Sequence, residues 1–483
     1  MSSADTEAPN ARTVQLWIGG KDVLPESGRY MEDLNPEDNS LFARIAEGTA
    51  GDINRAVEAA HEAFSEYRLS PAKEREAWLI NAAELLNKRS NEFTDILIDE
   101  IGSPVGKARL EIAQSILILR AAAGSIRHVS GKTMPSDTPG RFSMSVRKPV
   151  GVIAAITPFN VPLSKGVRLT ASPLALGNTV VLMPSEEAPV MGHFLAKLYA
   201  DAGIPPGAFN VVSGFGADIG DTLTSHPLVK VVTFTGSCQV GKHIQGICAN
   251  ANKRVTLELG GKNPLVIMAD ADLTKAVPGA IQSTFAFQGQ ICMSASRIFV
   301  QRSIFEEFTA KLASAAQSLG RGDLRDPTTV VGPIINTRQR DRVRSHIEDA
   351  LQKGATLVTG GQWENNRCQP TILSGVTPDM DVYAEETFGP VTSIYPFDTF
   401  DEALEKSNDS IYGLTAAIYT SNLDNAMKFA DNVESGMVHI NAPSIYAEPH
   451  VPFGGVGDSG FGREGTEVDI DLMTEWKWIT IQM

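Results

Sequence analysis

The chain has 483 residues, of which 42% are hydrophobic, and this is enough material for the cores of roughly two to four globular domains. Its formal net charge is -15. This excess of carboxylates argues against nucleic acid or an anionic membrane surface as a partner, because both are bound through excess Lys and Arg. A small molecule is the expected partner.

Cysteine usage and the N-terminal residues predict a reducing compartment. Four cysteines occur without a CxxC pair, and the eight histidines are scattered singly, so we expect no disulfide framework and no metal site. The first dozen residues are polar and lack the apolar stretch of a signal peptide. No later run approaches the roughly 18 apolar residues of a membrane span. We therefore expect a cytoplasmic protein.

Three zones follow an N-terminal tail. Residues 52–127 carry apolar positions at helical spacing, which predicts a helical layer. From 149 to 258, and again from 260 to about 440, short Val- and Ile-rich runs alternate with amphipathic stretches. This alternation predicts an α/β fold with two Rossmann-like parallel sheets, each covered by helices on both faces. The predicted strands are VGVIAAI, NTVVLM, FNVV, VKVVTF and RVTLEL, then PLVIM, RIFV, ATLVTGG, TSIYPF, TAAIYT and GMVHI.

Two segments fit neither pattern. They are residues 130–147 and the end of the chain, DLMTEWKWITIQM, whose apolar residues alternate. We expect edge strands that pair either with each other or with a neighbouring subunit.

Two strand ends carry features that suit a nucleotide. In VVTFTGSCQVGKHI, Gly236, Ser237 and Gly241 mark a turn from a strand into a helix, whose free N–H groups can bind a phosphate. The spacing is not GxGxxG, and taken alone it is more typical of a plain strand-to-helix turn than of a phosphate site. In NTVVLMPSEEAP, Glu186 can accept the hydroxyls of an adenosine ribose and repel the extra phosphate of NADP. Alternatively, it sits in the first turn of a helix, where the dipole favours it.

Three further residues could carry covalent chemistry. Cys292 lies in STFAFQGQICMSASR, where small and polar neighbours suggest an exposed turn, although a single cysteine is usually buried packing. Glu258 ends a predicted strand just before two glycines, where it serves either as a base or in an ion pair. Asn160 follows another strand and either donates to an oxyanion or forms an Asx-type turn beside Pro158 and Pro162. The other cysteines are expected to be structural.

These features occur in one chain in a fixed order, and together they resemble the aldehyde dehydrogenase superfamily. The resemblance runs from residue 17 to 478. The matching motifs are TPFN (157–160), MPSE (183–186), FTGS (234–237), LELGGK (257–262), FQGQICMS (287–294), EETFGPV (385–391) and PFGG (452–455).

The resemblance implies roles for these positions. Cys292 is similar to the nucleophile and Glu258 to the general base, while the Asn160 side chain and the Cys292 backbone N–H match the oxyanion hole. NAD is the implied cofactor, with NADP possible. The implied cofactor-binding residues are Thr157, Pro158, Phe159, Met183, Ser185, Glu186, Phe234, Gly236, Ser237, Leu259, Glu386 and Phe388. One departure is Met183, since the family usually has a lysine there, so one donor to the adenosine ribose is missing.

The implied chemistry suits these residue types. A thiolate, a strong nucleophile near neutral pH, adds to the aldehyde; hydride leaves for the nicotinamide, and water hydrolyses the thioester with Glu258 taking its proton. The resemblance also implies an NAD-binding domain (1–129 and 148–257), a catalytic domain (258–449), and an oligomerisation arm with the C-terminal segment (130–147 and 450–483). A homodimer or homotetramer is expected.

Within the family, the chain looks similar to bacterial dehydrogenases of aromatic aldehydes such as salicylaldehyde, vanillin or benzaldehyde. The residues expected around the substrate are Phe159, Val161, Arg168, Ile291, Met293, Tyr446 and Phe453, although each could equally be an ordinary core residue. Three alternatives stay open: a CoA-acylating enzyme, a succinate-semialdehyde or other aliphatic aldehyde dehydrogenase using Arg168, and a catalytically silent binding protein that kept the fold.

Overall fold

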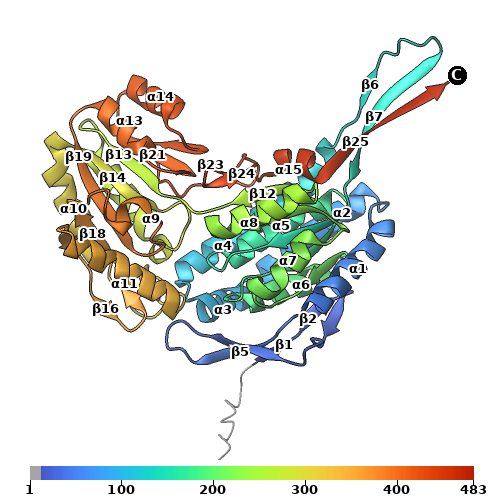
Figure 1. Cartoon of the computed structure of the whole chain (residues 1–483), viewed down its shortest axis with the longest axis horizontal. Coiled ribbons are helices and arrows are strands. Elements are labelled where there is room, and N and C mark those ends of the chain that lie inside the picture. Colours follow the sequence, from blue (N-terminus) through green and yellow to red (C-terminus); the bar gives the residue numbers. More distant parts are fainter. Residues whose placement is uncertain (1–11) are drawn as a thin grey trace, which may run out of the picture.

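The computed structural model describes residues 12–483, which form two lobes and a projecting arm (Figure 1). The first dozen residues, for which the sequence predicts no signal peptide, fall almost entirely in residues 1–11, and these lie outside the described range. An eight-stranded sheet builds the first lobe, a seven-stranded sheet the second, and a three-stranded sheet the arm. The expected α/β fold with two parallel sheets and a β arm is confirmed. Across residues 12–483, no helix combines the length and apolar character needed to cross a bilayer.

The first sheet has the five predicted strands at its centre, all parallel. Short antiparallel strands extend it at both edges. Its strands, in spatial order, are β24 (Gly460–Phe461), β12 (Arg254–Glu258), β11 (Val229–Thr235), β8 (Val152–Ile156), β9 (Thr179–Met183), β10 (Phe209–Val211), β2 (Leu16–Ile18) and β3 (Lys21–Val23).

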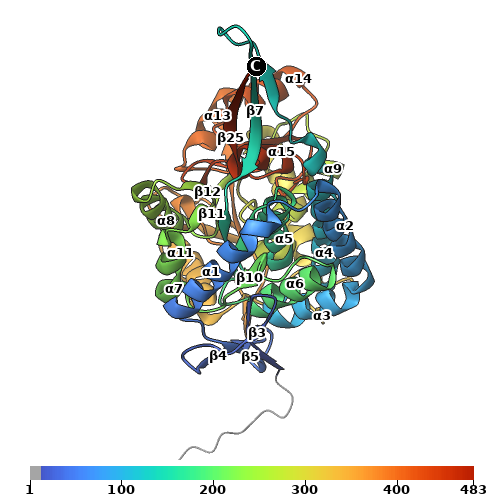
Figure 2. The ribbon, with the colours of Figure 1, turned by 90° about the vertical axis from the view of Figure 1, so that its right-hand side faces the viewer.

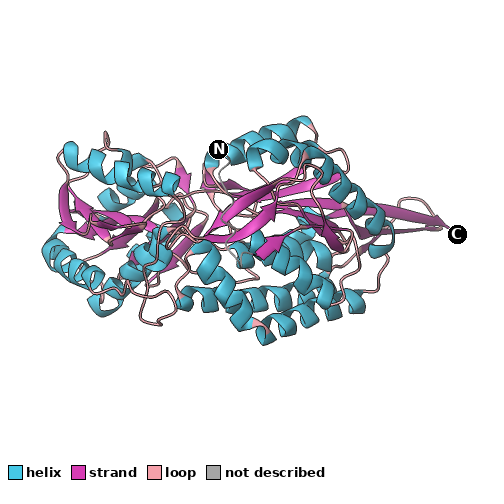
Figure 3. Cartoon of the chain, turned by 90° about the horizontal axis from the view of Figure 1, so that it is seen from below, coloured by secondary structure: helices cyan, strands magenta, loops and turns pink. Residues whose placement is uncertain are grey.

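Helices cover both faces of this sheet, and for this reason its strands are apolar throughout (Figure 3). Along β8, Val152 and Ala154 pack on one face, whereas Ile153 and Ala155 pack on the other. The first face is covered by α1 (Ala50–Tyr67), α7 (Gly216–Ser225) and α8 (Cys238–Asn250). The second is covered by α2 (Ala72–Lys88), α3 (Ser90–Ile101), α4 (Val105–Ser125), α5 (Pro162–Ala175) and α6 (Pro189–Asp201).

The second sheet repeats this plan. Its order is β15 (Thr356–Thr359), β18 (Thr371–Ser374), β19 (Val391–Phe397), β14 (Ala295–Gln301), β13 (Asn263–Ile267), β21 (Thr415–Tyr419) and β22 (Met437–Ile440), with only β15 antiparallel. One face packs on α9 (Leu273–Phe285) and α10 (Phe305–Gln317), the other on α11 (Thr337–Gln352), α13 (Phe400–Asn408) and α14 (Leu423–Asn432). Smaller elements are the hairpin β16–β17 (Trp363–Glu364, Arg367–Cys368), α12 (Asp381–Ala384), and β20 (Tyr412–Gly413) paired with β23 (Val456–Gly457).

The strands of the arm pair with one another within this chain. β7 (Arg141–Pro149) pairs antiparallel with β25 (Thr474–Gln482), and β6 (Lys132–Met134) lies on the other side of β7. The two unassigned segments therefore pair with each other. Just before β25, the chain adds β24 to the first sheet and packs α15 (Thr466–Met473) on α5.

The interpretation of the residues before 52 as a tail is wrong. β2 and β3 extend the first sheet, and a separate sheet of β1 (Arg12–Val14), β5 (Leu41–Ala46) and β4 (Tyr30–Leu34) lies at the end of the molecule opposite the arm (Figure 2). β18 was also not predicted. These strands are three to six residues long, too short for a period-two pattern to stand out.

Candidate functional site

Four of the motifs meet at one edge of the first sheet. β12, β11, β8 and β9 are adjacent and parallel, with Thr235 opposite Glu258 and Ile156 opposite both Phe234 and Met183. The segments that follow these strands therefore start side by side. The chain runs from β8 outward through β9 and β10, then returns to the other side of β8 with β11. Ligands of open parallel sheets bind outside the carboxyl ends at such a switch point.

Cys292 lies half-buried in a turn between the 3-10 helix η2 (Ala286–Gly289) and β14. The residues before it are strained, because Phe287, Gln288 and Gly289 all have left-handed backbones, at φ +47°, +44° and +70°. A Cβ at residue 289 would come within 2.1 Å of the carbonyl oxygen of Gly389. This nucleophile loop, residues 286–294, is thus pressed against the EETFGPV loop and requires glycine there.

Hydrogen bonds from outside the nucleophile loop hold it in this shape. The Asn263 side chain donates to the carbonyl oxygens of Cys292 at 2.8 Å and Ser294 at 2.9 Å. On the other side, Gln288 Oε1 accepts from the backbone N–H of Gly332 at 3.0 Å. The strained turn is therefore fixed from both ends.

Asn160 reaches the nucleophile loop from the first lobe. Its side chain is buried, and Nδ2 donates to the carbonyl oxygen of Gln290 at 2.8 Å, two residues before Cys292. The alternative of an Asx-type turn is wrong, since the amide bonds across the site and not to its own loop. An amide nitrogen carries two hydrogens, so one stays available to an oxyanion.

Glu258 ends β12 with a side chain that is only 2% exposed. Neither carboxyl oxygen has a hydrogen-bond partner among residues 12–483, so the alternative of a structural ion pair is wrong. Burial, followed by the Glu464 carboxylate, raises the pKa of Glu258 well above its ordinary value, and Lys165 partly opposes this. A Cβ at Gly454 would lie 2.5 Å from Glu258 Oε1, so PFGG leaves room for the carboxyl group.

Glu464 and Lys165 were missed by sequence reasoning. Lys165 Nζ and Glu464 Oε2 form a buried ion pair at 2.7 Å, and the other Glu464 oxygen has no hydrogen-bond partner in the described part of the chain. A lysine in the otherwise apolar start of α5, PLSKGV, was the available signal.

Burial governs the acidity of the Cys292 thiol. Burial raises the pKa of the Cys292 thiol to about 12, with Glu386, Glu258 and Glu464 adding to the rise and Lys165 lowering it. Burial, the largest of these causes, therefore disfavours the thiolate that the sequence suggested. A base must take the proton, and Glu258, whose own pKa is raised, is suited to that.

The predicted cofactor residues border the same edge. Ser237 caps α8, its Oγ accepting from Val240 N at 3.4 Å. Glu186 lies before α6, which starts at Pro189, so the first-turn explanation for Glu186 is wrong. The remaining positions in this first-lobe edge are buried at Thr157, Met183, Phe234 and Leu259 and half-buried at Pro158, Phe159, Ser185 and Gly236.

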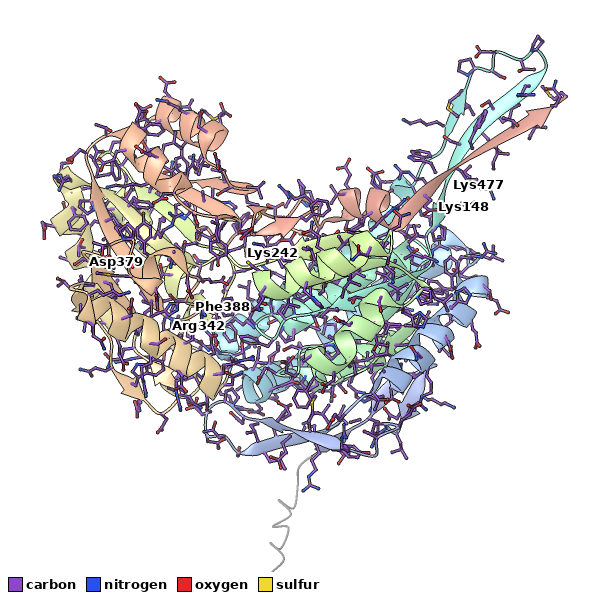
Figure 4. The ribbon with its side chains drawn as sticks, viewed as in Figure 1. Lys148, Lys242, Arg342, Asp379, Phe388 and Lys477 are labelled. Atoms are coloured by element: carbon purple, nitrogen blue, oxygen red, sulfur yellow. The ribbon has the colours of Figure 1, made fainter. Side chains whose placement is uncertain are left out.

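The other two cofactor residues come from the second lobe. Glu386 Oε1 accepts from the backbone N–H of Gly261 at 3.0 Å, and burial raises the pKa of Glu386 to about 7. Phe388 has a left-handed backbone, φ +52°, which is costly for an aromatic residue. Figure 4 places Phe388 where the two lobes meet, in line with a role in binding.

Aromatic and cationic side chains gather next to these groups. The Phe159 ring packs edge-to-face on Phe388 at 5.9 Å, and Phe453 is buried beneath Lys165 Nζ at 4.7 Å and Arg168 at 5.7 Å. Arg168 Nη2 donates to a backbone carbonyl, whereas its buried Nη1 has no partner within residues 12–483. Val161, Ile291 and Met293 are half-buried, but Tyr446 is 56% exposed and is not enclosed with them.

The comparisons with known proteins agree with this site. A model of the aldehyde dehydrogenase family matches residues 23–479. The chain belongs to the aldehyde dehydrogenase family. It is 40% identical to a vanillin dehydrogenase of Pseudomonas fluorescens, in an alignment that covers 97% of this chain and 98% of the relative. It is 39% identical to a benzaldehyde dehydrogenase of Pseudomonas putida whose name specifies NAD, and 96% of each chain is covered.

A solved structure gives the same picture. The chain superposes on a salicylaldehyde dehydrogenase of Pseudomonas putida G7, solved with salicylaldehyde, with a TM-score of 0.95, 33% identity and 98% coverage of both chains. The resemblance drawn from the motifs is confirmed, and the protein is an oxidoreductase of the aldehyde dehydrogenase family.

Proposed function

We propose that this aldehyde dehydrogenase oxidises aromatic aldehydes of the benzaldehyde, vanillin or salicylaldehyde type to carboxylic acids, with NAD as the hydride acceptor. The observation that supports the reaction is that Asn160 donates to the loop of Cys292 while Glu258 ends β12 at the same edge of the first sheet. The relatives named for vanillin and benzaldehyde support the aromatic class, and the rings of Phe159 and Phe453 suit an aryl group.

Each protein group has a defined task in this proposal. Glu258 takes the thiol proton of Cys292, and the sulfur adds to the aldehyde carbon. The free N–H of Asn160 and the backbone N–H of Cys292 donate to the resulting oxyanion. Hydride then leaves that carbon, which turns the adduct into a thioester. Glu258 gives the thiol proton up to solvent and then removes a proton from water, which attacks the thioester. The acid is released, and the leaving thiolate takes the proton from Glu258 to restore the thiol.

The chain's own residues fit a dinucleotide at this edge. The N-terminus of α8 offers N–H groups to a pyrophosphate behind Ser237. Glu186 follows β9, where a ribose is bound in sheets of this kind, and Glu386 and Phe388 face the same junction from the second lobe. When bound, NAD supplies the acceptor for the hydride.

We also propose the domain ranges inferred from the sequence: 1–129 and 148–257 for NAD, 258–449 for catalysis, and 130–147 with 450–483 for the arm and C-terminal segment. The end of β12 at Glu258 and the start of β13 at Asn263 support the central boundary. Within 450–483, however, β24 and α15 lie on the first lobe, so only β25 belongs to the arm.

A homodimer or homotetramer through the arm is part of the same proposal. The arm exposes large apolar side chains, among them Trp476 and Trp478, the latter 67% exposed. It projects from the body, with Lys148 and Lys477 near its base (Figure 4). Such a surface suits burial in an assembly. Light scattering of the full chain and of Trp478→Asp tests it, because a monomer in both cases contradicts the proposal. The cytoplasmic location stays a prediction.

A kinetic panel tests the activity. We expect NADH formation with a higher kcat/KM for benzaldehyde, vanillin and salicylaldehyde than for propanal, and NAD preferred over NADP. A preference for propanal would remove the aromatic assignment. Acyl-CoA as the main product in the presence of CoA would instead favour a CoA-acylating enzyme, and NAD binding without any turnover would favour a silent protein.

One observation favours a second candidate, an anionic aliphatic aldehyde such as succinic semialdehyde. Arg168 Nη1 is buried without a partner among the described residues, and a substrate carboxylate would satisfy it. If this candidate is right, Arg168→Leu loses succinic semialdehyde turnover about 100-fold and spares benzaldehyde. Equal losses of turnover with both aldehydes would show that Arg168 does not discriminate between them.

A further inference from the structure

Helix α4 carries a buried ion pair that the proposed chemistry does not use. Lys107 and Glu111 lie one turn apart, with side chains 13% and 2% exposed, and their charged groups are in contact. Two buried charges need further polar partners to offset their loss of hydration. Within residues 12–483, every further hydrogen bond of these two charged groups goes to the segment 160–164, which carries Asn160.

Glu111 holds the start of the helix that follows Asn160. Its Oε1 accepts from the backbone N–H groups of Leu163 at 2.9 Å and Ser164 at 3.1 Å, in the first turn of α5. First-turn N–H groups have no partner inside their helix, so this carboxylate acts as a cap supplied by another helix. The position of α5 at its N-terminus is therefore set by α4.

Lys107 holds the peptide of Asn160 itself. Its Nζ donates to the Asn160 carbonyl oxygen at 2.7 Å. The same Nζ lies 4.2 Å from the centre of the Phe287 ring, a cation–π contact with the strained nucleophile loop. One ammonium group therefore contacts both the Asn160 peptide and the nucleophile loop. The Asn160 side chain in turn donates to Gln290 in the same loop.

We propose that Lys107 is a positioning residue that sets the distance between the Asn160 amide and the Cys292 sulfur, with Glu111 anchoring the lysine and α5. The inference rests on the proposed function, because it assigns Asn160 to the oxyanion. A shift of the donor by about 1 Å is enough to cost up to about 100-fold in rate. Neither residue touches the substrate, so the effect is carried through Asn160.

The first test replaces Lys107 with methionine, an unbranched side chain one atom shorter that removes the charge and the donors. We expect kcat to fall by about 10- to 100-fold, with the KM for NAD unchanged. Lys107→Gln, which can still donate to the Asn160 carbonyl, should recover part of the loss. The matched control is Lys311→Met on α10, because Lys311 pairs with Glu307 at the same spacing on the surface. It should keep wild-type kcat.

A double-mutant cycle separates positioning from a purely structural role. In an Asn160→Ala background, Lys107→Met should lower kcat by less than about twofold further, because the group that it positions is gone. An equal loss in both backgrounds, or full kcat in Lys107→Met alone, would overturn the inference. Lys107→Gln takes its place in the cycle if Lys107→Met does not fold.

Different results would contradict the proposed function and the role of Lys107. If the wild-type enzyme reduces NAD with none of the aldehydes, the proposed function fails. If the wild type is active and Asn160→Ala loses turnover, but Lys107→Met behaves like Lys311→Met, only the role of Lys107 fails.

Discussion

Replacing Glu258 with glutamine should block hydrolysis of the thioester and leave the fold intact. Neither oxygen of Glu258 has a hydrogen-bond partner among the described residues, so the substitution strands no ion-pair partner. A positioned general base contributes about 100- to 10,000-fold in rate, which corresponds to about 3–5 kcal/mol. We therefore expect steady-state kcat to fall by about that factor.

Stopped-flow measurement of NADH is the assay. As pH rises toward the raised pKa of the Cys292 thiol, a larger fraction ionises without help, so at the alkaline limit of the assay Glu258→Gln should release about one NADH per active site and then turn over slowly. Wild-type kcat in this variant, or uniformly slow formation of NADH without a burst at any pH, would refute the role of Glu258 in hydrolysis.

The same variant should change how stability depends on pH. The pKa of Glu258 is raised in the folded chain, so its neutral form is favoured by folding. That stabilisation is complete below the pKa of the unfolded chain and is lost as pH rises through the folded value. Glu258→Gln should thus gain stability relative to wild type as pH rises. The matched control is Glu100→Gln. Burial raises the pKa of Glu100 to about 8, and its carboxylate accepts from the backbone N–H groups of Val190 and Met191 in α6, so this variant should show the same trend with normal kcat.

Three further predictions concern single residues. Alkylation of Cys292 by iodoacetamide should be slow at neutral pH and accelerate up to the alkaline limit of the assay, since the pKa of the thiol is raised to about 12; a plateau near pH 8 would contradict this. Arg297→Leu should lower the free energy of unfolding by about 2–4 kcal/mol in urea, because the buried guanidinium donates to the carbonyls of Lys262, Lys406, Ser407 and Asp409; an unchanged midpoint would contradict it. Met183→Lys should tighten NAD binding by about tenfold in a fluorescence titration by adding a charged donor at the end of β9, and weaker binding would show that the ammonium does not reach the ribose.

Local patterns were sufficient for the two sheets and not for the edges of the molecule. Strands such as β8 and β9 are buried on both faces, so their apolar runs are visible in the sequence. β2 has three residues and is defined by pairing with β10, almost two hundred residues later, which no local pattern records. Tertiary pairing decides such strands.

The candidate site divides in the same way. Cys292, Glu258 and Asn160 follow strand or turn signals that a reader of the sequence can find. The partners that tune them come from distant elements: Lys165 and Glu464 are 299 positions apart, and Lys107 and Asn160 are 53 apart. The raised pKa of the Cys292 thiol likewise arises from burial and from carboxylates on separate segments, and the sequence alone shows neither of these causes.

The last residues of the chain reach back to parts of the molecule made much earlier. β24 covers the open edge of β12, Glu464 pairs with Lys165 on α5, and β25 completes the arm with β7. During synthesis on the ribosome, the first lobe is therefore incomplete until the whole second lobe and the C-terminus have emerged. Until then, the edge of β12 is uncovered and Lys165 lacks its counter-ion. A stalled or truncated chain would expose a sheet edge that can pair with other chains. The C-terminal stretch is therefore needed to complete the first lobe and to protect it from misassembly.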